Sequence, residues 1–305
     1  MTWDALLTVM LAILGGALRV GAPFLFVSLG ECLTEKAGRI NLGLEGVLVL
    51  SAMASFGGAY LSGSAWIGVC AGMVSGALLA LLHGLLCSLP RVSDVATGIA
   101  LMLLGMGLAF YWGKSLIQPQ APQLQAWALG EWSQHPALRS ALAINPLVPL
   151  GVALAWLLHW GLRQSRWGLL VRMAGDSADA TRALGYSVGG LRVLATTAGG
   201  MLAGLGGACL TLYYPGSWNE GISSGQGLIA VALVIFARWD PRRCVTAALI
   251  FGGAGAVGPA LQSVGIGWGY HLFNTVPYVL TLVILVWSCR PGQLAAGSPG
   301  ELSSR

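Results

Sequence analysis

Nine apolar segments separated by polar connectors constrain the fold of this 305-residue chain more than any other feature. The segments cover 5–29, 42–62, 65–89, 94–113, 146–162, 193–213, 225–237, 244–264 and 272–289. A helix that crosses a bilayer needs about 20 apolar residues, and most of the segments approach that length. Only 9% of the residues are charged and 56% are hydrophobic, whereas about 25% of an ordinary soluble domain is charged. The sequence therefore predicts an all-α integral membrane protein with about nine transmembrane helices, within a range of about eight to ten.

The segments leave no room for a sizeable soluble domain. We expect one transmembrane domain over 1–290 and a disordered tail over 291–305, where Gly, Ser and Pro recur. The first segment contains Arg19, so we expect its helix to be broken or to begin as an interfacial helix. The first residues lack a basic stretch, which argues against a cleaved signal peptide.

The basic residues predict the orientation. If the connector 163–192 is cytoplasmic, alternation of the spans places thirteen Lys and Arg residues inside and only Lys114 and Arg139 outside, with Arg19 within the membrane. Cytoplasmic loops of membrane proteins carry the excess of Lys and Arg. We therefore expect the N-terminus outside and the C-terminus in the cytoplasm.

The remaining composition excludes other classes. The net charge of +5 is spread over short connectors, which fits membrane topology and not a nucleic-acid groove. The six cysteines include no C-x-x-C pair, so we interpret them as small buried hydrophobic residues and expect no metal site. The sequence contains no H-E-x-x-H motif that would indicate an intramembrane metalloenzyme.

The stretch from Gly30 to Gly46 has two interpretations. Four charged residues precede a segment that opens with Asn41, two glycines and Glu45, and such openings are typical of the discontinuous helices that line transporter sites. Alternatively, Glu45 lies at headgroup level and satisfies backbone N–H groups at a helix N-terminus. Both readings stay open at this stage.

The connector 163–192 is the second signal. Asp176 or Ser177 can cap a short helix over about 178–184, and Gly185 can end it. Such a cytosolic helix is suited to docking a soluble partner. A solvated connector is the alternative.

Three motifs then make the chain resemble the permease subunits of bacterial ABC importers of the branched-chain amino acid and simple-sugar class. Residues 35–46, EKAGRINLGLEG, are similar to the pattern E-(R/K)-x-G-x-(I/V)-N-(I/L)-G-(L/I)-E-G of the nucleoside-type subset, which pairs with basic-membrane-protein-type lipoproteins. Residues 172–186 resemble the coupling segment of the wider class, and residues 227–241, GLIAVALVIFARWDP, match its G-(F/L)-I-A-(I/V)-A-L-V-I-F-(G/A)-x-W-x-P. Met173 and the run 176–179 depart from the usual pattern.

The resemblance implies a transport subunit that is not itself an enzyme, in a bacterial cytoplasmic (inner) membrane. Two permeases, here two different chains, would form the pathway, two cytosolic ATPases would drive it, and an extracytoplasmic lipoprotein would deliver the solute. The sequence contains no G-x-x-x-x-G-K-(S/T), so ATP and Mg²⁺ are expected on the partner ATPase and no cofactor in this chain. The implied ATPase-coupling residues are Arg172, Asp176, Arg182, Ala183, Gly185 and Tyr186.

Polar residues in or beside the segments are the candidates for the substrate pathway. They are Asn41, Glu45, Asp94, Thr97, Asn219, Ser223, Gln226 and Asn274. Trp218, Phe236 and Phe273 are candidate aromatic faces for a nucleoside. Alternatively, each polar residue forms a hydrogen bond between helices or caps a helix, as Asp94 would for 95–113.

The expected solute is a nucleoside or a related small polar molecule, with simple sugars, pentoses or purine bases as the alternative. A passive channel or a secondary carrier would require an internal repeat or a proton relay. The chain offers one carboxylate inside a span and no clear repeat. This argues against both.

Overall fold

The computed structural model describes residues 3–265, 273, 275–288 and 297–303. Asn274, Cys289 and residues 291–296 of the expected tail lie outside the described residues. The main helices are α1 (Trp3–Lys36), α2 (Leu44–Ser62), α3 (Ala65–Leu86), α4 (Asp94–Gly113), α6 (Leu147–Gln164), α7 (Arg166–Asp176), α9 (Val188–Leu212), α10 (Gln226–Phe236), α11 (Pro241–Ser263) and α13 (Val276–Ser288). Short helices are η1 (Lys114–Leu116), α5 (Pro136–Ala141), α8 (Ala178–Ala183) and α14 (Gly300–Ser303), and β1 (Trp127–Ala128) pairs antiparallel with β2 (Ala143–Ile144).

Each of the nine predicted apolar segments coincides with a helix, namely α1, α2, α3, α4, α6, α9, α10, α11 and α13. Within the described residues, six helices are long and apolar enough to cross a membrane: α1, α2, α3, α4, α9 and α11. The protein is therefore an all-α, multi-pass membrane protein. The helix α10 has 11 residues and α13 has 13, and at about 1.5 Å per residue neither crosses the bilayer alone. Nine spans remain a prediction.

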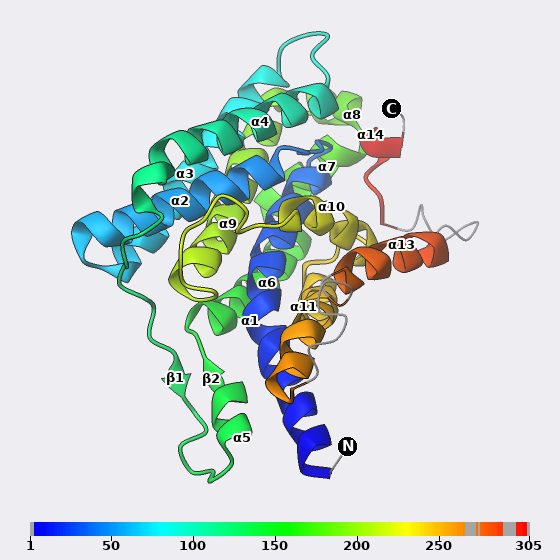
Figure 1. Ribbon diagram of the computed structural model, residues 1–305. Helices are drawn as coiled ribbons and strands as arrows, with labels where there is room; N and C mark the ends of the chain where they lie inside the picture. The colour runs from blue at the N-terminus through cyan, green and yellow to red at the C-terminus, as the bar shows by residue number, and fades with distance from the viewer. Residues whose placement is uncertain (1–2, 266–272, 274, 289–296, 304–305) are drawn as a thin grey trace.

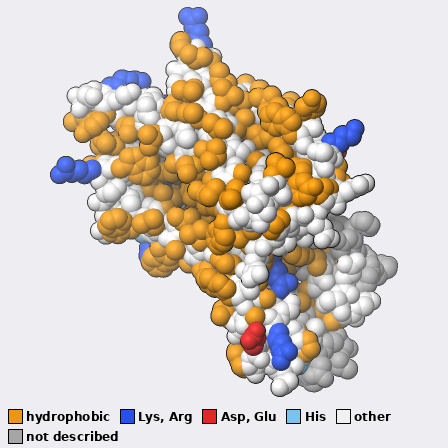
Figure 2. Space-filling model, turned by 90° about the vertical axis from the view of Figure 1, so that its left-hand side faces the viewer, with side chains coloured by type: hydrophobic (Ala, Val, Ile, Leu, Met, Phe, Trp, Pro, Cys, Tyr) orange, Lys and Arg blue, Asp and Glu red, His pale blue; other side chains and the backbone are white. Residues whose placement is uncertain are grey.

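The surface matches a lipid environment. Figure 2 shows a face covered by hydrophobic side chains, with Lys and Arg mainly at its edges. On α3 and α4 the exposed residues include Leu78, Leu103 and Tyr111, and Tyr111 is 79% exposed. Large contiguous apolar surfaces are rare on soluble monomers, so this face indicates contact with lipid or with another membrane chain.

The connectors separate into two ends. The N-terminal end of α1 lies with β1, β2 and α5, whereas α7, α8 and α14 lie at the opposite end (Figure 1). The predicted outer segment 114–145 and the predicted cytoplasmic segment 163–192 are thus on opposite ends of the bundle.

Glycines bring α3 and α9 into backbone contact. Gly76 faces Gly200, and a Cβ built on Gly76 would lie 2.3 Å from the Gly200 carbonyl oxygen. One turn away, a Cβ on Gly204 would lie 2.4 Å from the carbonyl oxygen of Gly72. The two small-residue pairs of the sequence therefore pack against each other, as small residues four apart permit in membranes.

Two local expectations were wrong. The helix α1 is continuous from Trp3 to Lys36, so it is not broken at Arg19. The guanidinium of Arg19 reaches α5 and donates to the hydroxyl of Ser140 at 3.1 Å, and an interfacial start of the helix stays a prediction. The cap of α4 is Ser93, whose hydroxyl accepts from the backbone N–H of Ala96, and Asp94 is the first helical residue. Its carboxylate is engaged elsewhere, as described below.

The cysteines largely match their expected role. Cys32, Cys87, Cys209 and Cys244 are buried, Cys70 is exposed, and all five carry free thiols. Disorder was predicted for 291–305. Within that range the structure describes 297–303, where α14 packs against α7.

Candidate functional site

The carboxylate of Glu45 holds the N-terminus of α10. One oxygen accepts from the Ser223 hydroxyl at 2.5 Å and from the Gly225 N–H at 2.9 Å, and the other accepts from the Gly227 N–H at 2.7 Å. The side chain is 5% exposed. Gly227 permits this approach, because a Cβ there would lie 2.6 Å from the Glu45 backbone nitrogen. Glu45 thus joins the start of α2 to the start of α10.

The hydrogen bonds of Glu45 bear on the second interpretation of the 30–46 stretch, and the first, a lining for a transporter site, stays a prediction. The carboxylate does satisfy backbone N–H groups at a helix N-terminus, where a negative charge is favourable. The helix is α10 and not its own α2, and α10 starts after Gly225, which has a φ of +77°. A short helix that begins inside the bundle has unsatisfied N–H groups, and Glu45 supplies the acceptor for two of them.

Asn41 lies in the turn that connects α1 to α2. Its backbone N–H donates to the Glu31 carboxylate at 2.8 Å, and its side-chain oxygen accepts from the Gly43 N–H at 2.9 Å. Asn41 is 2% exposed. In this chain it therefore shapes the turn.

Asp94 forms a buried ion pair with Arg39, which also donates to the carbonyl of Cys87. The pair ties the α1–α2 turn to the start of α4 and to the end of α3. Burial, followed by the charge of Asp94, raises the pKa of the Cys87 thiol to about 11. Both charged side chains are less than one-tenth exposed, so the pair belongs to the helix packing.

The remaining pathway candidates are less enclosed. Ser223 is buried and donates to Glu45, Thr97 is half-buried and Asn219 is exposed. Gln226, the first residue of α10, is half-buried, and its side-chain oxygen has no hydrogen-bond partner among the described residues. The structure therefore brings Glu45, Ser223 and Gln226 together, while Thr97 lies on α4 and Asn219 lies in an exposed part of the connector that leads to Ser223.

Among the aromatic candidates, Trp218 is 2% exposed and its indole N–H donates to the Gly113 carbonyl at 2.9 Å. It packs against the end of α4 and does not present an open face. Phe236 and Phe273 are half-buried.

The predicted short helix over 178–184 is confirmed as α8. The Ser177 hydroxyl accepts from the Ala180 N–H at 3.3 Å, and Gly185 follows the helix with a φ of +83°. The side chains of Leu184 and Tyr186 are 62% and 48% exposed. A Cβ on Gly185 would meet no atom within 4 Å. This end of α8 is open to a partner.

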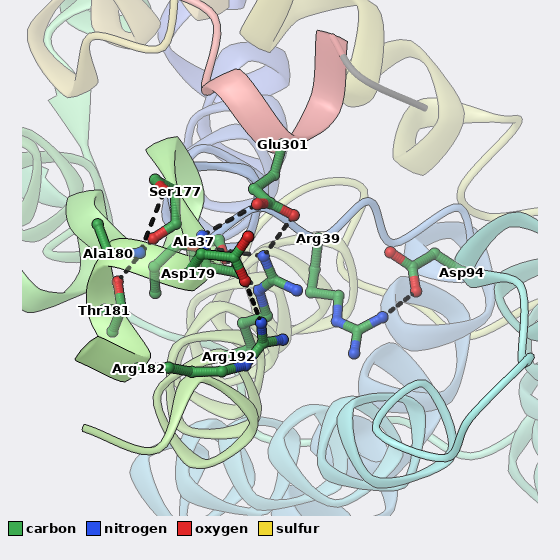
Figure 3. A network of polar contacts seen from close by, with 12 residues as sticks. Ala37, Arg39, Asp94, Ser177, Asp179, Ala180, Thr181, Arg182, Arg192 and Glu301 are labelled. Atoms are coloured by element: carbon green, nitrogen blue, oxygen red, sulfur yellow. Dashed lines mark hydrogen bonds and ion pairs between the residues drawn. The ribbon is translucent and has the colours of Figure 1, made fainter. Parts of the chain in front are cut away.

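The base of α8 is fixed by α14 (Figure 3). One Glu301 oxygen accepts from the Ala178 N–H at 3.0 Å, and the other pairs with Arg192 of α9 at 3.2 Å. On the exposed side, Arg182 pairs with Asp179 at 2.6 Å. The exposed end of α8 is therefore presented from a fixed base.

The family model of the branched-chain amino acid transport system permease component matches residues 13–287. The chain belongs to this family. It is thus an ABC transporter permease, a transport component and not an enzyme.

Three relatives of this chain are ABC transporter permeases whose names include a solute. The permease is 30% identical over 302 residues, covering 90% of this chain and 91% of the relative, to a Haloferax volcanii permease whose name assigns it provisionally to glucose. It is 26% identical to a nucleoside ABC transporter permease of Lactococcus lactis, with 90% of both chains covered. It is 27% identical to a guanosine ABC transporter permease of Bacillus subtilis, with 87% and 88% covered.

The other coupling candidates of the permease occupy different positions. Asp176 is exposed at the end of α7, and Arg182 and Ala183 are exposed on α8. Arg172 does not share that surface. It lines a cavity with Lys36 and Arg163.

Sequence reasoning missed several residues that hold these segments. Glu31, Gly225, Gly227 and Glu301 were not candidates, and Trp239 was not expected to donate to the buried Glu35. One signal was available for the α10 contacts. An apolar segment of only 225–237 must begin within the bundle, where its N–H groups need an acceptor.

Proposed function

We propose that this permease forms the translocation pathway of an ATP-driven importer for nucleosides. The observation that carries the proposal is the 35–46 motif, which is anchored by buried polar contacts. Arg39 pairs with Asp94, and Glu45 holds the start of α10. The nucleoside and guanosine permeases among its relatives, each aligned over most of both chains, support the same solute class.

For the solute itself, Gln226 is the strongest of the candidate residues. Its buried side-chain oxygen lacks a partner within the described part of the chain, and it lies beside the Glu45 contact. A carboxamide can accept from a ribose hydroxyl and donate to a base. Glu45 and Ser223 would then act through α10 by holding Gln226 in place, with Asn219 and Thr97 as further contacts.

The coupling role is proposed for α8. We infer nine spans with the N-terminus outside and the C-terminus inside, which places α7 and α8 in the cytoplasm. The exposed end around Arg182, Ala183, Gly185 and Tyr186 would contact the ATPase. Asp176 borders it, and Arg172 would support it from the cavity side.

The complete importer would contain a second, different permease chain, two ATPase subunits and an extracytoplasmic binding lipoprotein in a bacterial inner membrane. ATP and Mg²⁺ would bind the ATPase. The outer segment with Trp127 and Trp132, which are 53% and 75% exposed, is the part of this permease that would meet the binding protein or the bilayer surface.

A sugar is the second candidate solute, because the Haloferax relative assigned provisionally to glucose is 30% identical to this permease. Uptake separates the two. The gene and its neighbours are deleted and then restored, and entry of radiolabelled adenosine, guanosine, uridine and glucose is measured.

Loss of nucleoside uptake in the deletion and its recovery on restoration is the expected result. Gln226→Ala should then raise the KM for the nucleoside. Unchanged nucleoside uptake with lost glucose uptake would refute the nucleoside assignment and favour the sugar.

A further inference from the structure

Five basic side chains line one cavity at the end of the bundle that holds α7 and α8. Its volume is about 370 Å³, and it lies between α1, α6, α7 and the turn from α10 to α11. The basic residues are Lys36, Arg163, Arg172, Arg238 and Arg243, and the only acidic residue among the lining is Asp240. They come from separate elements, so the fold and not a local charge run gathers them.

The single negative charge of Asp240 offsets only one of these five basic side chains. Asp240 caps α11 by accepting from the Arg242 N–H at 3.0 Å, and it bonds the His159 ring at 2.9 Å. Every Asp and Glu side chain of the sequence is described except that of Asp4, which belongs to the first turn of α1 at the opposite end of the bundle. Glu35 and Asp176 also lie near Lys36, but neither lines the cavity. The cavity therefore has a net positive charge.

Arg172 supplies an unused donor. Its Nε is buried and has no hydrogen-bond partner among the described residues. A buried donor without an acceptor is costly, and the cost is removed when an anion supplies one. The guanidinium fork matches phosphate oxygens in geometry.

The backbone beside the cavity is strained. Arg238 and Trp239 both have a φ of +53°, which lies in the left-handed region that residues other than glycine rarely adopt. The indole N–H of Trp239 donates to the buried Glu35 of α1, which anchors the turn. Strained backbone of this kind gathers at ligand sites, where the surrounding structure holds it.

One wall of the cavity continues into a lipid-facing surface. His159 and Arg163 line the cavity from α6, and on the same helix Trp156 and Trp160 are each 56% exposed. The guanidinium of Arg242 lies 5.1 Å from the Trp156 ring centre. Tryptophans with this exposure are typical of the headgroup level.

We propose that this cavity binds a phosphate-bearing anion, supplied by the headgroup of an anionic phospholipid that enters beside α6. Lys36, Arg172 and Arg243 would contact the phosphate, and Trp160 would lie against the lipid backbone. A free phosphate anion offers the same chemistry, so the test includes it. The binding measurement is made in detergent and does not depend on the proposed orientation or solute.

The test titrates the purified full-length permease with dihexanoyl phosphatidylglycerol, dihexanoyl phosphatidylcholine and sodium phosphate by calorimetry. Wild type, Arg172→Gln/Arg243→Gln and the control Arg166→Gln are compared. Arg166 is exposed on α7 and does not line the cavity. Gel filtration verifies that each variant is folded, and Arg163→Gln at the rim replaces the double variant if that variant aggregates.

Phosphatidylglycerol should bind wild type and Arg166→Gln with affinities within about twofold, and the double variant about tenfold more weakly or worse. Phosphatidylcholine, which has no net charge, should bind at least about tenfold more weakly than phosphatidylglycerol. Equal binding of sodium phosphate would identify a free anion as the ligand. Phosphatidylglycerol binding that matches phosphatidylcholine, or that is unchanged in the cavity variants, would overturn the proposal.

Discussion

Replacing Glu45 by Gln tests whether its carboxylate is a structural acceptor or a group that binds solute. The carboxylate accepts three hydrogen bonds at 2.5, 2.9 and 2.7 Å. The amide keeps one acceptor oxygen but turns an NH₂ group toward backbone N–H donors. The closeness of Gly227 leaves little space for a water to replace the lost acceptor.

The magnitude follows from these contacts. One lost charge-assisted bond costs about 1.5–3 kcal/mol, and the lost charge at the N-terminus of α10 adds about 0.3–1 kcal/mol. A destabilisation of about 2–4 kcal/mol should lower the Tm by about 5 °C or more, since 1 kcal/mol shifts the Tm of a larger chain by about 2–4 °C.

The assay is thermal unfolding of the purified permease in detergent, with Glu220→Gln as the matched control. Glu220 is exposed in the same 214–224 connector, so its Tm should change by less than about 1 °C. Solute uptake is measured in parallel. If Glu45→Gln unfolds at the wild-type temperature but loses uptake, the carboxylate binds solute and the structural reasoning fails.

Three further predictions follow from local geometry. Gly185→Arg should leave membrane insertion intact, because the site is open, but should abolish uptake. Gly185→Asn should retain uptake, since Asn tolerates a positive φ, and normal uptake by the Arg variant would refute a coupling role for α8. Gly76→Leu should abolish the folded peak in gel filtration, because its Cβ would lie 2.3 Å from a backbone oxygen. Gly107→Leu should keep that peak, because a Cβ there would meet no atom within 4 Å, and a folded Gly76→Leu protein would contradict the packing. The pKa of the Cys87 thiol, raised from 9.0 to about 11, reduces the thiolate fraction at pH 8 by about a hundredfold, so maleimide should label the exposed Cys70 well before Cys87; equal rates would contradict this.

The helices of the fold could be predicted because their signals are local. Runs of apolar residues marked the nine helical segments, and Ser177 and Gly185 marked both ends of α8 within about one residue. Asp94 shows the limit of local reasoning. Ser93 and Asp94 are both suitable caps, and the choice depends on Arg39, which lies 55 residues away in the sequence and pairs with Asp94.

The partners in the candidate site could not be predicted for the same reason. Ser223, Gly225 and Gly227 lie 178 to 182 residues after Glu45, and no spacing rule connects them. The sequence identified Glu45 as a buried charge that needed a partner. It did not show that three groups at the start of another helix supply that partner. Similarly, the Gly and Pro residues around 291–305 predicted disorder from composition alone. The contact of Glu301 with Arg192, which positions α14, is a tertiary contact that the sequence does not reveal.

The backbone contact between α3 and α9 also limits how the permease can move. On two successive turns, a backbone carbonyl of one helix packs against a glycine Cα of the other. If one helix slid along the other by a fraction of a turn, the flanking side chains would collide with the opposing backbone. The two helices must therefore travel as one rigid body. The start of α10 is held to α2 by hydrogen bonds to one carboxylate and by the contact of Gly227 with the Glu45 backbone, and a joint with so few polar contacts can open and close. A transport cycle in this architecture would keep the α3–α9 pair fixed and rearrange around α10.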